Sequence, residues 1–211
     1  MKESTLREEI CAIAKSIFDR GLTHGSSGNI SVRLADGNFL LTPTNSCLGR
    51  LDPAKLSKLD GSGKLINGDP PSKESFLHLA MYQERPASEA VVHLHSLHAV
   101  AVSCLSDIDP ADVFPPITAY AIMQVGKLAL VPYYPPGDQS LAAAVRKLAR
   151  SHHAVLLANH GPVVAGTSLA AATNAIEELE QTAHLMLLLQ GRPVRLLTPE
   201  QIAEINRRFP G

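Results

Sequence analysis

The sequence predicts a single α/β domain over residues 1–211, with a mixed central sheet flanked by helices. Segments with helical and strand-like patterns alternate along the chain, without internal repeats or low-complexity linkers. The chain has 211 residues, of which 45% are hydrophobic, so one core can form without covalent crosslinks. Cys11, Cys47 and Cys104 are odd in number and far apart, which indicates reduced thiols rather than a disulfide framework or a cysteine-ligated zinc.

The first expected element is an amphipathic helix. A capping-box pattern at residues 5–8 opens it, apolar residues recur at helical spacing, and Gly21 supplies a stop signal. A loop of small residues, 24–29, follows. It leads into a β-hairpin with strands 30–34 and 39–42 around an Asp-Gly turn.

The middle of the chain continues the alternation. After a glycine-rich turn and two prolines, Ser72 can cap a helix with an apolar face over residues 76–81. A β-branched run predicts a strand over residues 90–95. Ser96 can then cap a helix that follows the strand and extends to about Cys104.

Helices and strands also alternate in the last part of the chain. Its expected elements are strands 122–125 and 128–131, a helix to about Ser151, strand 154–158, a helix over 169–190 and a last short helix opened by Thr198 and Pro199.

Three histidines lie where strands are expected to end. His93 and His95 are two apart on a predicted strand, so both rings point to one face and can share an ion, while Leu94 faces the other side. His160 lies just after strand 154–158. Three imidazoles with an open fourth position are typical of catalytic zinc. Each could also be an ordinary hydrogen-bonded histidine, the interpretation we give to His24, His78, His98, His152, His153 and His184.

Glu74 stands in the first turn of the helix after Ser72. A carboxylate near a bound dication can be a ligand, a general base or both. The alternative is a charge that complements the helix dipole.

Loops of small polar residues are candidates for binding a phosphate group. Their hydroxyls and backbone N–H groups could surround an anion, and one of them lies at a helix N-terminus. The candidates are Ser26, Ser27, Gly28, Asn29, Thr44, Asn45, Ser72 and Lys73. Together they suggest a phosphorylated substrate, although each loop alone could be a plain turn.

Charge and hydropathy argue against large anionic partners. The 19 basic and 20 acidic residues leave a formal charge of −1 and form no run of one sign, so neither nucleic acid nor a membrane surface is expected to bind. The charged N-terminus does not match a signal peptide, and the apolar stretch 185–189 is too short to span a bilayer. We therefore expect a cytoplasmic protein.

The motifs and their order resemble the class II aldolase/adducin family. The pattern covers nearly the whole chain. Its parts are Gly25 to Ser31 for Gly-x-x-Gly-Asn-x-Ser, Thr42 to Asn45 for Thr-Pro-x-Gly, Pro71 to Glu74 for Pro-Ser-x-Glu, Val91 to His95 for Val-Val-His-x-His, and His160-Gly161.

This resemblance implies an α/β/α sandwich with a mixed, largely antiparallel sheet. It implies Zn²⁺, with Mn²⁺ or Co²⁺ as substitutes, held by the three histidines, with Glu74 as acid/base and ligand of the free state. It places Tyr120 as the catalytic tyrosine, for which the alternative is a half-buried sheet residue. It also implies a homotetramer with active sites between subunits. Two departures from the family pattern, Asn45 for Gly and Lys73 for Ser, are expected to alter the phosphate contacts.

Further segments resemble the 3-oxo-tetronate 4-phosphate decarboxylases of this family. They are 46–49, 51–53, 71–74, 131–134, 136–138 and 158–164. The implied reaction releases CO₂ from a phosphorylated sugar acid and yields dihydroxyacetone phosphate through an enediolate. Lys73 favours this reaction on the hypothesis that its ammonium binds the acid, and the alternative is a solvated lysine at a helix start. One alternative is an aldolase that cleaves a ketose 1-phosphate through the same enediolate. Another is an adducin-like interaction module, which the three retained histidines disfavour.

Overall fold

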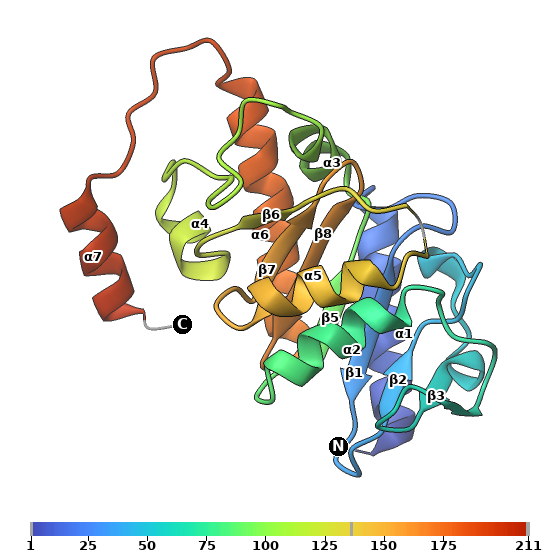
Figure 1. Ribbon diagram of the computed structural model, residues 1–211. Coiled ribbons are helices and arrows are strands. Elements are labelled where there is room, and N and C mark those ends of the chain that lie inside the picture. The colour runs from blue at the N-terminus through green and yellow to red at the C-terminus, as the bar shows by residue number, and fades with distance from the viewer. Residues whose placement is uncertain (1, 136, 210–211) are drawn as a thin grey trace.

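The computed structural model describes residues 2–135 and 137–209. Helices and strands alternate along this chain (Figure 1). The helices are α1 (Glu3–Asp19), α2 (Ser75–Glu84), α3 (Leu97–Ser103), α4 (Ala119–Gln124), α5 (Ser140–Ala149), α6 (Leu169–Leu188) and α7 (Pro199–Arg208), with short 3-10 turns at Leu48–Arg50 and Pro53–Lys55. The strands are β1 (Asn29–Arg33), β2 (Phe39–Leu41), β3 (Ser57–Leu59), β4 (Leu65–Asn67), β5 (Ala90–His93), β6 (Ala129–Val131), β7 (Ala154–Leu157) and β8 (Gly161–Gly166).

The described strands form one eight-stranded sheet. Their order is β4-β3-β2-β1-β5-β8-β7-β6. Every neighbouring pair is antiparallel except β6 and β7, which are parallel. The expectation of a mixed, largely antiparallel sheet is therefore confirmed.

Helices cover both faces of the sheet. On one face the buried side chains of α1, α3 and α6 pack against alternate residues of the central strands. On the other face α2 and α5 lie side by side and pack against the intervening residues (Figure 1). The period-2 alternation divides β5 in this way, because Val92 belongs to the first core and Val91 to the second. The result is an α/β/α sandwich.

Strand β5 is central to this sheet and ends at the candidate site. All four of its residues are buried, and it lies between β1 and β8. In the register, His93 faces Asn29 of β1 and Val163 of β8. Burial on both faces explains why β5 reads as a short apolar run rather than an alternating strand.

Four segments differ from the sequence prediction in their type. β3 and β4, at the edge of the sheet, and β8 are strands that the sequence analysis did not identify. Residues 122–125, expected as a strand, belong instead to α4 and its cap. The Thr118 side chain accepts a hydrogen bond from the Ala121 N–H and so caps this helix, whose short apolar pattern alone does not distinguish helix from strand.

Two helices begin at other residues than expected. α1 starts at Glu3, so the Thr5 capping box does not form. α2 starts at Ser75 with Glu74 at the cap position, although the Ser72 hydroxyl still accepts a hydrogen bond from the Glu74 N–H at 3.3 Å. By contrast, the expected capping box of α7 is present between Thr198 and Gln201.

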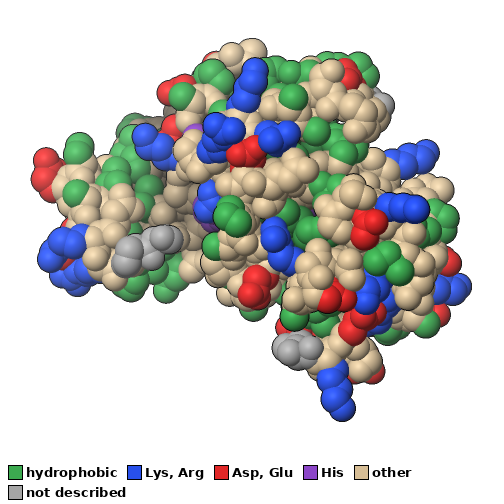
Figure 2. Space-filling view, turned by 60° about the horizontal axis from the view of Figure 1, so that its bottom comes forward, with side chains coloured by type: hydrophobic (Ala, Val, Ile, Leu, Met, Phe, Trp, Pro, Cys, Tyr) green, Lys and Arg blue, Asp and Glu red, His purple; other side chains and the backbone are tan. Residues whose placement is uncertain are grey.

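Helix α7 lies apart from the sheet at the end of an extended segment and contacts α4 (Figure 1). Its side chains are exposed or half-buried. Figure 2 shows Lys and Arg side chains interspersed with Asp and Glu on one face of the molecule, in keeping with the balanced composition. Within residues 2–135 and 137–209, no helix is both long and apolar enough to cross a membrane.

Candidate metal centre

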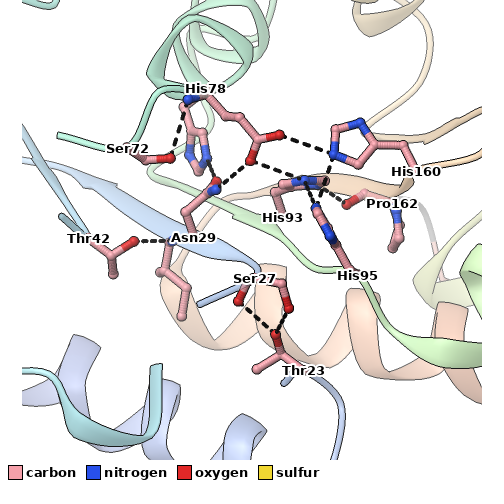
Figure 3. Close-up of polar contacts among 12 residues, drawn as sticks. Thr23, Ser27, Asn29, Thr42, Ser72, His78, His93, His95, His160 and Pro162 are labelled. Atoms are coloured by element: carbon pink, nitrogen blue, oxygen red, sulfur yellow. Dashed lines mark hydrogen bonds and ion pairs between the residues drawn. The ribbon is translucent and has the colours of Figure 1, made fainter. Parts of the chain in front are cut away.

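Four side chains from separate parts of the chain meet beside the end of β5. His93 is the last residue of β5, His95 follows two residues later, His160 lies in the turn between β7 and β8, and Glu74 caps α2. One ligand atom from each lies within 4.8 Å of the others (Figure 3). The antiparallel pairing of β5 with β8 brings His160 to the other two histidines. This cluster could hold a divalent metal ion.

The spacing of the donor atoms fits a small dication. The Nε2 atom of His95 lies 3.1 Å from that of His93 and 3.0 Å from that of His160. Ligands about 2.05 Å from a tetrahedral zinc would be about 3.3 Å apart. The Glu74 carboxylate lies on the same side, 3.4 Å from His93 Nε2 and 3.1 Å from His160 Nε2. Nitrogen lone pairs this close repel one another unless a proton or a cation lies between them.

The structure fixes the tautomer of His93. Its Nδ1–H donates to the carbonyl oxygen of Pro162 at 2.8 Å, so Nε2 carries the lone pair that faces the cluster. The ring is fully buried, and burial lowers the pKa of His93 to about 4. Burial also lowers the pKa of His95. Both rings are therefore in the neutral form that binds metal ions.

Glu74 is held as a carboxylate. Burial alone would raise its pKa, but His93 and the hydrogen bonds from His160 and Asn29 outweigh burial, and the pKa of Glu74 lies well below its ordinary range. Asn29 Nδ2 donates to Glu74 Oε2 at 2.8 Å. An ionised carboxylate beside three imidazoles is suited to a metal ligand or a base.

Two glycines allow other backbone segments to approach the ligand strand. Gly161 has φ of 153°, and a Cβ there would lie 2.3 Å from the Leu94 carbonyl oxygen. Gly28 has φ of 81°, and its Cβ would lie 3.1 Å from the His93 carbonyl oxygen. The Asn29 loop and the His160 turn can both pack against this strand because neither position carries a side chain.

The cluster opens onto a cavity of about 550 Å³. Glu74, His95 and His160 line it, whereas His93 is fully buried behind them. The rest of its lining is Gly21, His24, Leu97, Val100, Tyr133, Tyr134 and Asn159. The sequence predicts only an ordinary hydrogen-bonded role for His24. Tyr133 and Tyr134 belong to segment 131–134, one of those that resemble the decarboxylases, and no other sequence signal marks them.

The three loops expected to bind phosphate lie together. The Ile30 N–H donates to Thr42 Oγ1, and the Ser72 N–H donates to the Thr42 carbonyl oxygen (3.1 and 3.3 Å). Among the candidate residues, Ser26, Thr44 and Asn45 line a second cavity of about 390 Å³ together with Arg50 and Lys55.

The other candidate residues are placed differently. Ser72 is buried beside Glu74, and Lys73 is exposed. Ser27 donates to the His24 carbonyl oxygen at 2.6 Å and so stabilises its own loop. Asn29 faces Glu74, as described above. Gly28 lacks a Cβ and so allows its loop to lie close to the His93 backbone.

Tyr120 is neither a sheet residue nor part of the cavity at the cluster. It lies on α4 with 64% of its surface exposed. It lines a separate hollow with Arg20, Gln124 and Glu177. The alternative of a half-buried sheet residue is wrong, because Tyr120 lies on α4 and its side chain is exposed. Within one copy of the chain, Tyr120 does not join Glu74.

Comparison with known proteins agrees with this geometry. Residues 8–187 match the family described as Class II Aldolase and Adducin N-terminal domain. The chain belongs to the class II aldolase/adducin family.

Two curated relatives are informative. A 3-oxo-tetronate 4-phosphate decarboxylase from Escherichia coli (strain K12) is 52% identical over 204 residues, covering 97% of this chain and 96% of the relative. An L-fuculose phosphate aldolase from the same strain is 34% identical over 213 residues, covering 99% and 96%.

Solved structures extend the likeness to three dimensions. The crystal structure of YgbL from Escherichia coli has a TM-score of 0.95 at 51% identity and covers 96% of this chain and 98% of its own. An L-fuculose 1-phosphate aldolase has a TM-score of 0.86 at 29% identity, with 99% and 98% covered. The protein is an enzyme of this family, a carboxy-lyase, so the interaction-module alternative is wrong.

Proposed function

We propose that this enzyme decarboxylates a 3-oxo-tetronate 4-phosphate to dihydroxyacetone phosphate and CO₂. The observation that carries the proposal is the 52% identity to a decarboxylase of that name over 97% of the chain, against 34% to an aldolase. The histidine and glutamate cluster supports it, because loss of CO₂ from a β-keto acid leaves an enediolate whose negative charge needs stabilisation.

We propose zinc as the ion, with Mn²⁺ or Co²⁺ as substitutes. His93, His95 and His160 would hold it, and Glu74 would be a further ligand in the free enzyme. A divalent ion bound there would supply a Lewis acid that stabilises negative charge on the substrate oxygens. The exposed side of the cluster faces the larger cavity, which gives the substrate one direction of approach.

After CO₂ leaves, carbon C2 of the enediolate must take up a proton. Glu74 lies at the cavity and is our first candidate, but as a carboxylate it must first collect a proton. Tyr120 is the second candidate, and it can act only on the cavity of another copy of the chain, since it lies apart from its own. We therefore propose a homotetramer with active sites between subunits. We also propose that the enzyme works as one domain in the cytoplasm.

The phosphate group would bind beyond the metal centre. Ser26, Thr44 and Asn45 line the second cavity, where the basic Arg50 and Lys55 could bind the phosphate beside two acidic residues, Asp52 and Asp69. Loop 24–26 borders both cavities, because His24 lines the first and Ser26 the second. The N–H groups of Ser27, Thr44 and Ser72 already donate to backbone carbonyl oxygens. Other backbone N–H groups of loops 26–29, 44–45 and 72–73 would contribute, and Lys73 would bind the anionic acid.

Product analysis tests this function. Zinc-loaded protein is incubated with the erythro and threo 3-oxo-tetronate 4-phosphates and with fuculose 1-phosphate, and CO₂ and dihydroxyacetone phosphate are measured. Both products in equal amounts are expected from one of the acids. Dihydroxyacetone phosphate from fuculose 1-phosphate, with no CO₂ from either acid, would replace the decarboxylase by the family's aldolase reaction. The variant His160→Ala controls for metal-independent decay of the β-keto acids.

A further inference from the structure

A chain of buried hydrogen bonds runs from Glu74 into the core. Asn29, which donates to Glu74, receives through its Oδ1 atom a contact from His78 Nε2 at 2.5 Å (Figure 3). The other ring nitrogen, His78 Nδ1, lies 2.6 Å from Ser31 Oγ. Ser31 Oγ lies 2.9 Å from the Tyr82 hydroxyl. These residues come from β1 and α2, and only the metal-centre end of the chain reaches the cavity.

The charge on Glu74 sets the direction of every bond in this chain. An ionised carboxylate only accepts hydrogen bonds, so Asn29 must turn its NH₂ group toward Glu74 and its carbonyl oxygen toward His78. His78 must then carry its proton on Nε2 in order to donate. A neutral imidazole carries one N–H, which leaves Nδ1 to accept from the Ser31 hydroxyl. Ser31 in turn accepts from the Tyr82 hydroxyl.

The surroundings of His78 keep its ring neutral. Its side chain is 2% exposed, and burial lowers the pKa of His78 to about 3. At the far end, Tyr82 is 3% exposed, and its ring contacts both Phe39, at 4.7 Å between centroids, and the Arg33 guanidinium, at 4.8 Å. These contacts fix the hydroxyl that starts the chain. The Asn29 amide therefore has one satisfied orientation.

We propose that His78, anchored by Ser31 and Tyr82, is a positioning residue that locks the Asn29 amide with its N–H toward Glu74. The proposal rests on the role of Glu74 in the proposed function. Without a donor at the His78 Nε2 position, the side-chain amide of Asn29 can rotate by about 180° and present its carbonyl oxygen to the Glu74 carboxylate. Glu74 would then lose a charge-assisted hydrogen bond and its fixed place beside the histidines.

Two amide substitutions separate this role from mere packing. His78→Gln keeps an N–H donor at the position of Nε2, whereas His78→Asn places its amide near the position of Nδ1, out of reach of Asn29. We expect kcat of His78→Asn to fall about tenfold to a hundredfold with KM nearly unchanged, and His78→Gln to retain activity within about threefold. His152→Gln, at the opposite end of β7 from His160, is the matched control and should resemble the wild type.

A measurement without substrate completes the test. In metal-loaded protein labelled with ¹⁵N-histidine, the His78 signals, assigned by their loss in His78→Gln, should show the neutral tautomer protonated at Nε2 at pH 7. The tautomer protonated at Nδ1 would overturn the proposal, as would equal kcat values for His78→Asn and His78→Gln at equal stability. If the protein proves to be an aldolase, the kinetic arm is run on the ketose 1-phosphate and the NMR result is unaffected, so the two proposals fail separately.

Discussion

His93 of β5 donates a hydrogen bond from Nδ1 to the carbonyl oxygen of Pro162, the second residue of β8, at 2.8 Å. The bond joins neighbouring strands and at the same time aims Nε2 at His95 and His160. A backbone carbonyl thus orients one ligand, while His160, two residues before Pro162, supplies another. The pairing of β5 with β8 is therefore part of the candidate metal centre.

Removal of one histidine should abolish metal binding. Loss of a group that merely orients a ligand costs 10- to 100-fold in affinity, so we expect His160→Ala to lose at least about a hundredfold. The measurement is metal content after equilibrium dialysis at fixed free Zn²⁺. His152→Gln should bind as the wild type does. Equal metal content in His160→Ala would place the ion elsewhere.

Metal should also stabilise the fold. A ligand that binds only the native state contributes about 2.7 kcal/mol at a concentration 100 times its Kd, which for a chain of this size corresponds to a rise in Tm of about 5–10 °C. Calorimetry before and after chelation of the purified protein measures the shift. The same treatment of His160→Ala should leave Tm where it was, and a comparable shift in that variant would contradict the assignment.

Gly161→Ala should be strongly destabilising. Its Cβ would lie 2.3 Å from the Leu94 carbonyl oxygen, so the His160 turn or the ligand strand must move. We expect a loss of about 2–4 kcal/mol in urea unfolding, together with weaker metal binding. Gly37→Ala is the matched control, because Gly37 also has a positive φ, of 82°, but a Cβ there meets nothing within 4 Å. Its cost should be about 1 kcal/mol.

Acid should destabilise the metal-free protein partly through His78. The ordinary pKa of 6.5 falls to about 3 in the folded state, mainly because of burial and secondarily because of His93. Between these values the unfolded chain binds a proton that the folded protein does not. Stability is thus lost as pH falls from about 6.5, by up to about 1.4 kcal/mol per unit from this residue. Urea unfolding between pH 7 and pH 4.5 should show a shallower slope for His78→Gln, and parallel slopes would argue against the shift.

Mixing two variants of low activity can show whether Tyr120 acts in the active site of a neighbouring subunit. If Tyr120 acts on a neighbouring copy, Tyr120→Phe should lower kcat without loss of metal, since the tyrosine lies away from the cluster of its own chain. Random co-assembly with His160→Ala should then recover about a quarter of wild-type activity, because a site needs one intact residue from each of two chains. Activity no greater than the sum of the separate variants would exclude action across subunits.

The sequence predicted the sheet-forming segments best where their pattern was strong. The hairpin of β1 and β2, strand β5 and the long helix α6 follow from periodicity and turn residues, although β5 ends at His93 and not at residue 95 as expected. β3 and β4 have only three residues each, and β8 opens with Gly and Pro, which suggest a chain reversal rather than a strand. Local patterns of this length do not distinguish helix from strand, as α4 shows.

The candidate site likewise contains residues that the sequence predicts and residues that it does not. His93 and His95 could be paired from their spacing alone, although only His93 belongs to β5 and His95 lies two residues beyond its end. The contact between Asn29 and His78 spans 49 positions and arises only when α2 packs on β1. His78 was accordingly interpreted as an ordinary buried histidine, since nothing near it in sequence indicates a partner. Whether Tyr120 reaches a site depends on a second chain and lies beyond any pattern within one.

Loop 24–26, which borders both cavities, would make the proposed enzyme selective for the length of its substrate. A molecule that reaches both the histidine cluster and the residues around Arg50 must have its keto acid and its phosphate at opposite ends. Shorter acids, or acids lacking the phosphate, could occupy only one side of the loop. Selectivity would then depend on substrate length, and the turn that contains Gly25 would set that length.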